Sequence, residues 1–336
     1  MEWRIAARPT GRELRVEDFS RSESDPSTQG HPAPGEVLVR TLMLSCDPAQ
    51  KGWMENAGGY AAPTEIGDIM PAGGVGQVVE SAASGFSAGD FVAGPLGWRD
   101  VGLVPASVLR HVPREADSPQ LQLGLLGSTG LTAYFGLLRI GLPQPGDTLV
   151  VTGAAGGVGS IVGQIGKMAG CRVIGIAGGP EKCRWLTEEL GFDAAIDYKS
   201  ENAKRRVKEL APEGIDILWD NVGGQMLDDL LARIARKARI VICGGIARYQ
   251  QPGRPAGPAN YFNIVFKSAR MEGFLMSDFA AEADEGRARL LKWYREGKII
   301  YRDEIVDGLD TAPQTLMRLF SGGNTGKLLI RVAEPT

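Results

Sequence analysis

The sequence predicts an α/β fold with a doubly wound parallel sheet and a separate, β-rich N-terminal domain. Short apolar runs divided by Gly, Pro and Asp fill the chain up to about residue 125, which is typical of a compact barrel or sandwich. From about residue 148, strand and helix patterns alternate, as in a parallel sheet covered on both faces. With 336 residues the chain is long enough for two domains, which we expect at 1–125 and 126–299, with 300–336 completing the first.

The individual elements follow from the period of the apolar residues. In the first region we expect strands at 36–40, 76–80 and 90–93. In the second region we expect strands at 149–151, 172–176, 194–196, 215–219 and 239–243, and helices at 158–165, 181–190, 202–210 and 226–234. A loop at 252–259, a last long helix at 281–297 and a strand at 326–330 that returns to the first domain complete the chain.

Composition and charge argue against several classes of partner. The net charge is −3 and no basic run could neutralise a nucleic-acid backbone, so we expect no nucleic-acid partner. No apolar run approaches the ~18 residues of a membrane span, and the first residues lack the apolar stretch of a secretory signal. The cysteines, Cys46, Cys171, Cys183 and Cys243, are scattered, which favours reduced thiols and the cytoplasm.

The turn 153–159 has the context of a nucleotide-binding Rossmann motif. It reads Gly-Ala-Ala-Gly-Gly-Val-Gly, directly after a strand and directly before a helix, with Ala154 in place of the usual first glycine. Glycine allows the tight turn and the close approach of a pyrophosphate, and the N–H groups at the helix start face the phosphates. The alternative is a plain strand–turn–helix that binds nothing. The candidate cofactor-binding residues are Gly153, Ala155, Gly156, Gly157, Val158 and Gly159.

The end of the second strand favours NADPH over NADH. In proteins that bind NAD, this strand ends near an Asp or Glu that holds the ribose 2′-hydroxyl. Here it ends Ile-Ala-Gly-Gly-Pro at 176–180, and the first acid is Glu181. The missing carboxylate leaves room for a 2′-phosphate, which Gly178, Lys182 and Tyr198 could bind. In the alternative, Lys182 is a solvated helix residue, and the strictness of the preference stays open.

A family resemblance rests on seven segments. They are Leu44-Ser-Cys-Asp-Pro48, 127–134 (Gly-Ser-Thr-Gly-Leu-Thr-Ala-Tyr), 152–166, 191–195, 220–224 (Asp-Asn-Val-Gly-Gly), 270–274 (Arg-Met-Glu-Gly-Phe) and 326–327 (Gly-Lys). With them the chain resembles the medium-chain dehydrogenase/reductase superfamily, in the zinc-independent branch of prostaglandin reductases, plant double-bond reductases and bacterial curcumin reductases. The resemblance implies a GroES-like first domain, a Rossmann domain, NADPH and usually a homodimer. It also implies cofactor contacts from Thr129, Asn221, Gly245 and Asn324.

The resemblance to this superfamily also lets us predict that the site holds no metal. Zinc-dependent relatives bind the metal through a Cys, a His-Glu pair and a later ligand. Cys46 lies near the first ligand position, but residues 70–76 read Met-Pro-Ala-Gly-Gly-Val-Gly, without a histidine. Zinc needs three or four N, S or O ligands, and the chain has two histidines, His31 and His111. We therefore expect Cys46 to be a buried small hydrophobe.

Without a metal, reduction of an activated C=C bond fits better than oxidation of an alcohol. Hydride from NADPH would add to the β-carbon of an α,β-unsaturated aldehyde or ketone, with donors to the enolate and a proton from a side chain or water. Bacterial curcumin reductases resemble this chain at Gly59-Tyr60-Ala61, which makes Tyr60 the candidate acid; the tyrosine of the prostaglandin branch is Phe266 here. The candidate pocket residues are Trp53, Met54, Tyr60, Tyr249 and Tyr261, and Tyr249 is also a candidate cofactor contact.

Other interpretations stay open. A quinone reductase of the same superfamily is one, although residues 44–54 favour the enone branch. A non-catalytic sensor that binds NADPH and a partner protein is another. Each aromatic or Met pocket candidate could instead pack in an ordinary core. The sequence does not identify the physiological small-molecule substrate.

Overall fold

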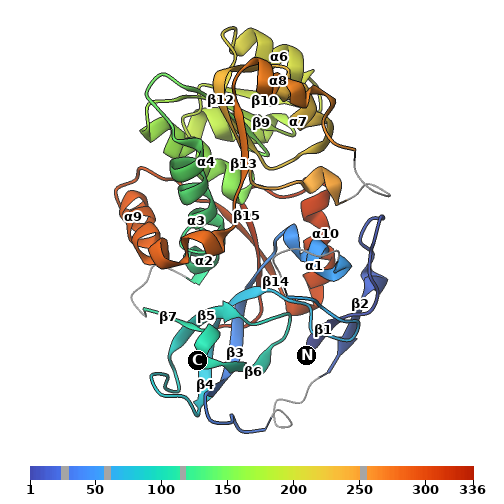
Figure 1. Ribbon diagram of the computed structural model, residues 1–336. Coiled ribbons are helices and arrows are strands. Elements are labelled where there is room, and N and C mark those ends of the chain that lie inside the picture. Colours follow the sequence, from blue (N-terminus) through green and yellow to red (C-terminus); the bar gives the residue numbers. More distant parts are fainter. Residues whose placement is uncertain (24–29, 57–61, 114–118, 250–255) are drawn as a thin grey trace. The chain divides into compact units, whose positions relative to one another are not determined.

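The computed structural model describes residues 1–23, 30–56, 62–113, 119–249 and 256–336 (Figure 1). It divides into two compact units. Unit 1 holds Met1–Gly124, Asp303–Asn324 and Leu328–Thr336, and unit 2 holds Leu125–Arg302 and Thr325–Lys327. One unit contains antiparallel strands and the other a parallel sheet, so the predicted fold class is confirmed.

Unit 1 is built on a seven-stranded sheet and a two-stranded ribbon. The sheet order is β14-β15-β3-β4-β5-β7, with β6 also paired to β3, and β1 pairs with β2. The long strand β3 is central because it pairs antiparallel with β4, β6 and β15. The bounds are β1 Glu2–Ile5, β2 Phe19–Ser22, β3 Glu36–Ser45, β4 Gly73–Ser81, β5 Phe91–Pro95, β6 Val101–Pro105, β7 Arg110–Val112, β14 Asp303–Asp307, β15 Lys327–Arg331, α1 Ala49–Glu55, α2 Pro119–Leu123 and α10 Ala312–Phe320.

Unit 2 is built on a six-stranded parallel sheet with the order β10-β9-β8-β11-β12-β13. Its middle strands are apolar and fully buried, as parallel strands covered on both faces are. The strands are β8 Thr148–Thr152, β9 Arg172–Ala177, β10 Ala194–Asp197, β11 Ile215–Asp220, β12 Ile234–Ile242 and β13 Arg270–Gly273. The helices are α3 Ser128–Phe135, α4 Gly157–Met168, α5 Pro180–Arg184, α6 Ala203–Leu210, α7 Gly224–Leu231, α8 Asn263–Phe266 and α9 Ala283–Arg295.

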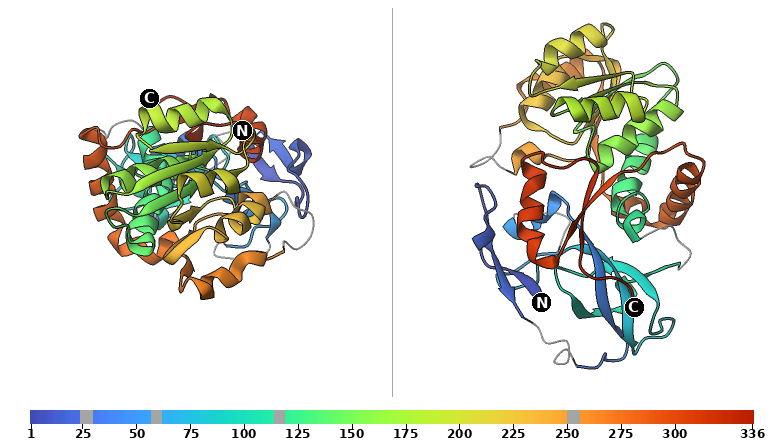
Figure 2. Two further views of the ribbon diagram at one scale, coloured as in Figure 1. Left: turned by 90° about the horizontal axis from the view of Figure 1, so that it is seen from above. Right: turned by 180° about the vertical axis from the view of Figure 1, so that it is seen from behind.

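Helices cover both faces of the parallel sheet (Figure 2). Val150 packs in a cluster with Val207 of α6 and Leu230 of α7. The next residue along the strand, Leu149, points to the other face, where its side chain lies against Gly166 of α4. The sheet is therefore covered on both faces, and a ligand could approach it at the amino ends or the carboxyl ends of its strands.

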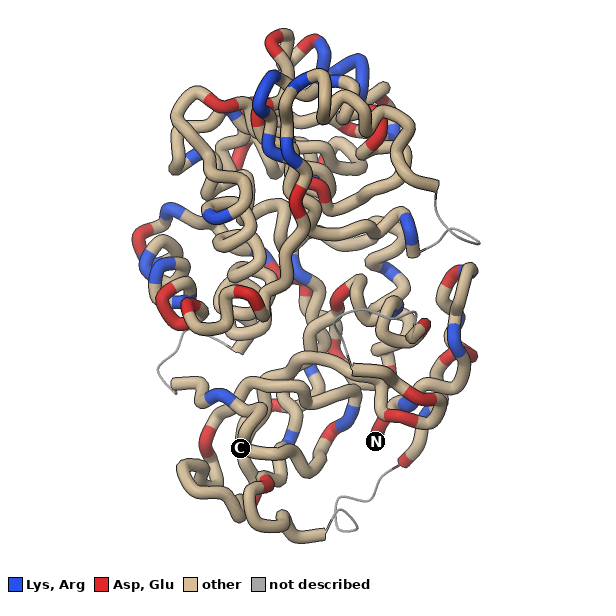
Figure 3. The backbone as a smooth tube through the Cα atoms, in the orientation of Figure 1, with Lys and Arg blue, Asp and Glu red and all other residues tan. Residues whose placement is uncertain are grey.

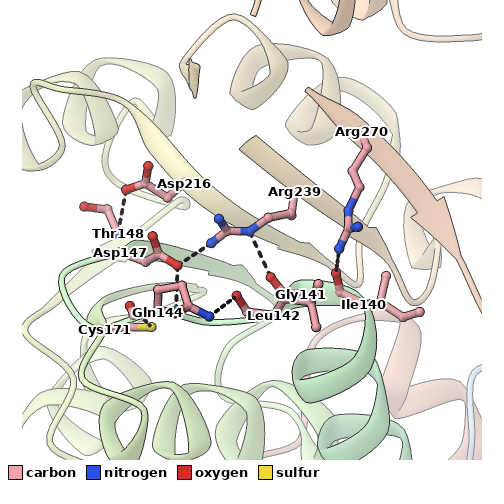
Figure 4. A network of polar contacts seen from close by, with 10 residues as sticks. All are labelled: Ile140, Gly141, Leu142, Gln144, Asp147, Thr148, Cys171, Asp216, Arg239 and Arg270. Carbon is pink, nitrogen blue, oxygen red and sulfur yellow. Dashed lines mark hydrogen bonds and ion pairs between the residues drawn. The ribbon is translucent and has the colours of Figure 1, made fainter. Parts of the chain in front are cut away.

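The amino ends of the strands are tied together by polar contacts (Figure 4). Arg239 of β12 pairs with Asp147, just before β8, and its Nε donates to the carbonyl oxygen of Gly141 at 2.9 Å. The backbone N–H of Thr148 donates to the Asp216 carboxylate of β11 at 2.9 Å. This edge of the sheet is closed by protein groups, which leaves the carboxyl edge as the place for a ligand.

The charged residues are mixed in sign along the chain (Figure 3). On α6, Lys204 pairs with Asp229, and Arg206 pairs with Glu201 and Glu209. The most basic helix is thus neutralised by its own neighbours. Among the described residues, no helix has the length and apolar character that crossing a membrane requires.

The structure differs from the sequence prediction at several elements. The expected helix 181–190 is α5 followed by a π-helical stretch at Trp185–Glu189. Ile234, expected to end a helix, begins β12. The strand β13 and the helix α10 are among the elements that were not predicted. The strand β13 has only four residues, and two of them are charged.

Candidate nucleotide site

The glycine turn lies at the carboxyl end of the central strand β8. Gly153 adopts a φ of +60°, which favours glycine, and the Gly156 N–H donates to the Gly153 carbonyl at 3.1 Å. A Cβ on Gly159 would lie 2.4 Å from the Gly153 carbonyl oxygen and 2.8 Å from the Ala154 Cα. Position 159 therefore requires glycine, because the backbone atoms that a Cβ would meet cannot move aside.

The start of α4 offers donors to an anion. The first backbone N–H groups of a helix, here those of Gly157, Val158 and Gly159, have no acceptor within the helix, and the helix dipole adds positive potential. A Cβ on Gly156 would meet only the Gly153 carbonyl oxygen, at 3.3 Å. This cradle of backbone N–H groups without side chains fits the pyrophosphate of a dinucleotide.

Two buried side chains flank this cradle. A Cβ on Gly157 would lie 3.0 Å from Thr129 Cγ2 and 3.4 Å from the Cβ and Cδ of Lys327. Thr129 was predicted from the resemblance, whereas Lys327 was not. Gly326 beside it donates from its N–H to the Ala155 carbonyl at 2.8 Å, which ties this late segment to the turn.

One end of the site lies beyond β9 and β10. A Cβ on Gly178 would lie 2.9 Å from Tyr198 Cε1 and 3.0 Å from Lys199 Cε, so the three residues are neighbours. Gly178 and Tyr198 were predicted from the sequence, and Lys199 was not. Asp197 accepts hydrogen bonds from the N–H groups of Gly179 at 2.7 Å and Lys199 at 3.0 Å. The Gly179 bond is the main reason that the pKa of Asp197 is lowered.

The cations near this end are Lys182 and Lys199. Lys182 lies on α5, directly after the Gly178–Gly179 turn. Lys199 was missed from the sequence, although it follows Tyr198 directly and could have been found from that position. Lys182 on α5 and Lys199 after β10 both follow the strand ends where a 2′-phosphate would be expected.

The other end lies beyond β11 and β12. Asn221 donates from Nδ2 to the Thr152 carbonyl at 2.7 Å, and its Oδ1 accepts from Trp219 Nε1 at 3.1 Å. Its amide is thus used to hold the turn, and its contact with a cofactor stays a prediction. Gly245 precedes a short 3-10 turn, Ile246–Arg248, and Tyr249 ends that turn.

The predicted pocket residues are not brought together in one unit. Met54 is fully buried in the core of unit 1, and the Trp53 carbonyl accepts from Thr64 Oγ1 at 2.7 Å. Asn324 also belongs to unit 1. Tyr261 is on the surface of unit 2 with 58% of its area exposed. Tyr60 lies outside the described residues, and the substrate contacts of all of them stay predictions.

Within the described ranges, no three His, Cys, Asp or Glu side chains gather in a group that could hold a metal ion. Cys46 is 1% exposed and packs in the core of unit 1. His31 hydrogen-bonds Glu80, and His111 contacts the Gly85 carbonyl at 2.7 Å and stacks on Phe86. The absence of zinc stays a prediction from the residue pattern.

Comparison with known proteins places the chain in a family. Residues 1–112 match a family model described as the N-terminal domain of oxidoreductase, and residues 157–293 match the zinc-binding dehydrogenase family. The chain is 42% identical over 336 residues to the NADPH-dependent curcumin reductase of Escherichia coli, covering 98% of this chain and 96% of that protein. It belongs to the medium-chain dehydrogenase/reductase superfamily, in the curcumin, alkenal and prostaglandin reductase branch. It is an oxidoreductase.

Other relatives agree with this placement. The tobacco 2-alkenal reductase (NADP(+)-dependent) is 36% identical over 302 residues, covering 89% of this oxidoreductase and 88% of the relative. Rat prostaglandin reductase 1 is 38% identical, covering 88% of this chain and 89% of that protein. The crystal structure of CurA from Vibrio vulnificus in complex with NADPH has a TM-score of 0.93 at 38% identity, over 99% of both chains.

Proposed function

We propose that this oxidoreductase uses NADPH to reduce the C=C bond of α,β-unsaturated aldehydes or ketones. One observation carries the cofactor assignment: the glycine turn presents the backbone N–H groups at the start of α4, and Gly178, Tyr198 and Lys199 are neighbours beyond β9 and β10, with no acid at the end of β9. The relatives named as NADPH-dependent curcumin reductase and NADP-dependent 2-alkenal reductase support the same cofactor and substrate class.

The reaction asks three things of the protein. NADPH supplies the hydride, which adds to the β-carbon of the conjugated carbonyl. The protein must stabilise the negative charge on the carbonyl oxygen by hydrogen-bond donors and must deliver a proton to the α-carbon. We assign the proton to Tyr60, from its place in Gly59-Tyr60-Ala61, with water as the alternative donor.

The activity is tested by mixing the protein with NADPH and following the absorbance of the reduced nicotinamide. We expect turnover with 2-alkenals or curcumin and none with saturated aldehydes. Turnover with quinones but not with conjugated aldehydes would favour the quinone reductase. Tight NADPH binding without turnover of any conjugated carbonyl or quinone would favour the sensor.

The proton donor is tested by Tyr60→Phe. We expect kcat to fall about 100-fold, as for the loss of a general acid, while the Kd for NADPH is unchanged. Tyr294→Phe, on α9, is the matched control and should keep at least half of the wild-type kcat. Wild-type turnover in Tyr60→Phe would assign the proton to water or to another group.

We infer that the protein forms a homodimer through the free edge of the parallel sheet. The edge strand is β13, and the nearby Phe262, Val265 and Phe266 expose 51%, 63% and 68% of their areas. Two copies paired antiparallel about a two-fold axis at Met271 would set Arg270 opposite Glu272 of the other copy, which is favourable. Sedimentation should give a dimer for the wild type and a monomer for Phe266→Glu; a monomeric wild type would reject this.

We propose the cytoplasm as the compartment. The structure describes Cys46, Cys171, Cys183 and Cys243, and none of these four forms a disulfide, which suits reducing surroundings. Burial raises the pKa of Cys171 and Cys183 to about 11, so these thiols are protonated at neutral pH and unreactive.

A further inference from the structure

A buried carboxylate lies at the carboxyl edge of the parallel sheet and has no role in the function proposed above. Asp220 is the last residue of β11 and has 0% of its area exposed. It takes part in none of the ion pairs found in the part of the chain that the structure describes. Burying an unpaired carboxylate is costly unless hydrogen bonds compensate. Its presence in the centre of the sheet therefore calls for an explanation.

The compensation comes from hydrogen-bond donors on two loops. Thr152 Oγ1, at the end of β8, donates to Asp220 Oδ1 at 2.8 Å. The backbone N–H of Val222 donates to Oδ1 at 3.2 Å, and that of Gly223 reaches Oδ2 at 2.9 Å. Gly223 precedes α7, so the carboxylate also lies at a helix start. All these groups are donors, and they favour the ionised form against the effect of burial, which raises the pKa of Asp220.

These bonds join three loops that border the nucleotide site. The Asp220 carbonyl accepts from the N–H of Cys243 at 2.9 Å, which fixes the loop after β12. The Cβ of Asn221 lies 3.4 Å from the place of a Cβ on Gly153. The carboxylate thus links the end of β8 to the loop after β11, and the backbone carbonyl of the same residue holds the start of the loop after β12.

The sheet order tells which end of a dinucleotide lies here. The 2′-phosphate end is expected beyond β9 and β10, on one side of the glycine turn of β8. The other end of a bound dinucleotide, with the nicotinamide, would then be held by the loops after β11 and β12. This ring is neutral when reduced and carries one positive charge when oxidised.

We propose that Asp220 is a positioning residue for the nicotinamide end of the site, whose buried negative charge holds the loop Asn221–Gly223 in place and favours the oxidised ring over the reduced ring. The inference rests on the proposed NADPH function. It adds a way in which this chain promotes hydride release, because an anion fixed in the protein stabilises the positive charge that release leaves behind.

The test compares binding of the two cofactor forms to Asp220→Asn. This change keeps the size of the side chain and one acceptor oxygen but removes the charge. We expect the ratio of the Kd for NADP+ to the Kd for NADPH, measured by calorimetry, to rise about fivefold to tenfold. Asp216→Asn is the matched control, on the same strand but at the opposite edge, and should leave this ratio unchanged.

A second variant separates charge from packing. Thr152→Val removes a donor and keeps the carboxylate, so we expect weaker binding of both cofactor forms with a ratio near that of the wild type. This variant also serves if Asp220→Asn does not fold.

The outcomes distinguish the two proposals. An unchanged ratio in Asp220→Asn, or a changed ratio in Thr152→Val, would overturn the role of Asp220 while the cofactor assignment stands. A wild-type protein that binds neither NADP+ nor NADPH would overturn the proposed function itself.

Discussion

The two ends of the nucleotide site use the same local device in opposite surroundings. At each end an aspartate is the last residue of a strand, Asp197 in β10 and Asp220 in β11, and its carboxylate accepts from the N–H groups of the following loop. At the first end, the bonds prevail and the pKa of Asp197 is lowered, chiefly by Gly179. At the second end, burial prevails and the pKa of Asp220 is raised.

The difference matches what each end has to bind. Asp197 is followed by Tyr198 and Lys199, which are exposed, so a phosphate here would meet water and cations together. Asp220 is followed by a loop that packs against the glycine turn, so a flat ring here would meet a dry and fixed wall. Surroundings, rather than residue type, decide what an aspartate at a strand end can do.

The largest effect should come from the glycine turn that separates the two ends. Gly159→Ala would place its Cβ 2.4 Å from the Gly153 carbonyl oxygen, and backbone cannot yield as a side chain does. We expect a loss of about 3 kcal/mol in the free energy of unfolding and no measurable NADPH binding. Denaturant unfolding and calorimetry measure both.

Gly157→Ala is the control for this change. Its Cβ would meet side-chain atoms of Thr129 and Lys327 at 3.0–3.4 Å, and these can shift. We expect its stability to stay within about 1 kcal/mol of the wild type. Equal losses of unfolding free energy in Gly159→Ala and Gly157→Ala would contradict a special steric requirement for glycine at position 159.

The parts of this site that are local in the chain could be predicted from the sequence. The strand, glycine turn and helix at 148–168 are consecutive, and each glycine has a steric reason that the pattern carries. The NADPH preference followed in the same way from the residues after β9. Thr129 and Tyr198 lie near Gly157 and Gly178, and their contacts with the cofactor stay predictions.

The residues missed are those that reach the site through the tertiary fold. Lys327 comes from the far end of the chain, and only the pairing of Gly326 with the turn brings it to α4. Asp220 was noticed only as part of a family motif, because an aspartate at a strand end usually reads as a turn residue. Its burial depends on the neighbouring strands β8 and β12, which the sequence pattern does not order.

A smaller effect should come from removing the cations near the end of the site where we expect the 2′-phosphate. Lys182→Ala and Lys199→Ala each remove a cation from the loops that would meet a 2′-phosphate. We expect the Kd for NADPH to rise about 10-fold to 100-fold in each variant and the Kd for NADH to change less than about 3-fold. Fluorescence titration with both cofactors gives the four comparisons.

The control is Lys208→Ala, an exposed cation of α6, which should change neither constant. Equal losses for NADPH and NADH in the Lys182 variant would contradict phosphate binding by this end. A loss in the Lys199 variant alone would move the phosphate contact from α5 to the loop after β10.

The smallest effect should appear in the pH dependence of stability. The stability that Asp197 contributes is present above its ordinary pKa of 3.8 and is lost as the pH falls through its lowered pKa. For Asp220 the pKa is raised, so its contribution is present below 3.8 and is lost as the pH rises through the higher value. Cys243 beside it, with its pKa raised to about 12, stays neutral throughout.

Unfolding free energies between about pH 3 and pH 7 test this contrast in the wild type, Asp197→Asn and Asp220→Asn. As the pH falls, the advantage of the wild type over Asp197→Asn should shrink, while its stability relative to Asp220→Asn should improve, each by up to about 1 kcal/mol. Two differences that change in the same direction would mean that both aspartates have the same surroundings in solution. The assignment of opposite pKa shifts to Asp197 and Asp220 would then be wrong, because that assignment depends on the different burial of the two carboxyl groups.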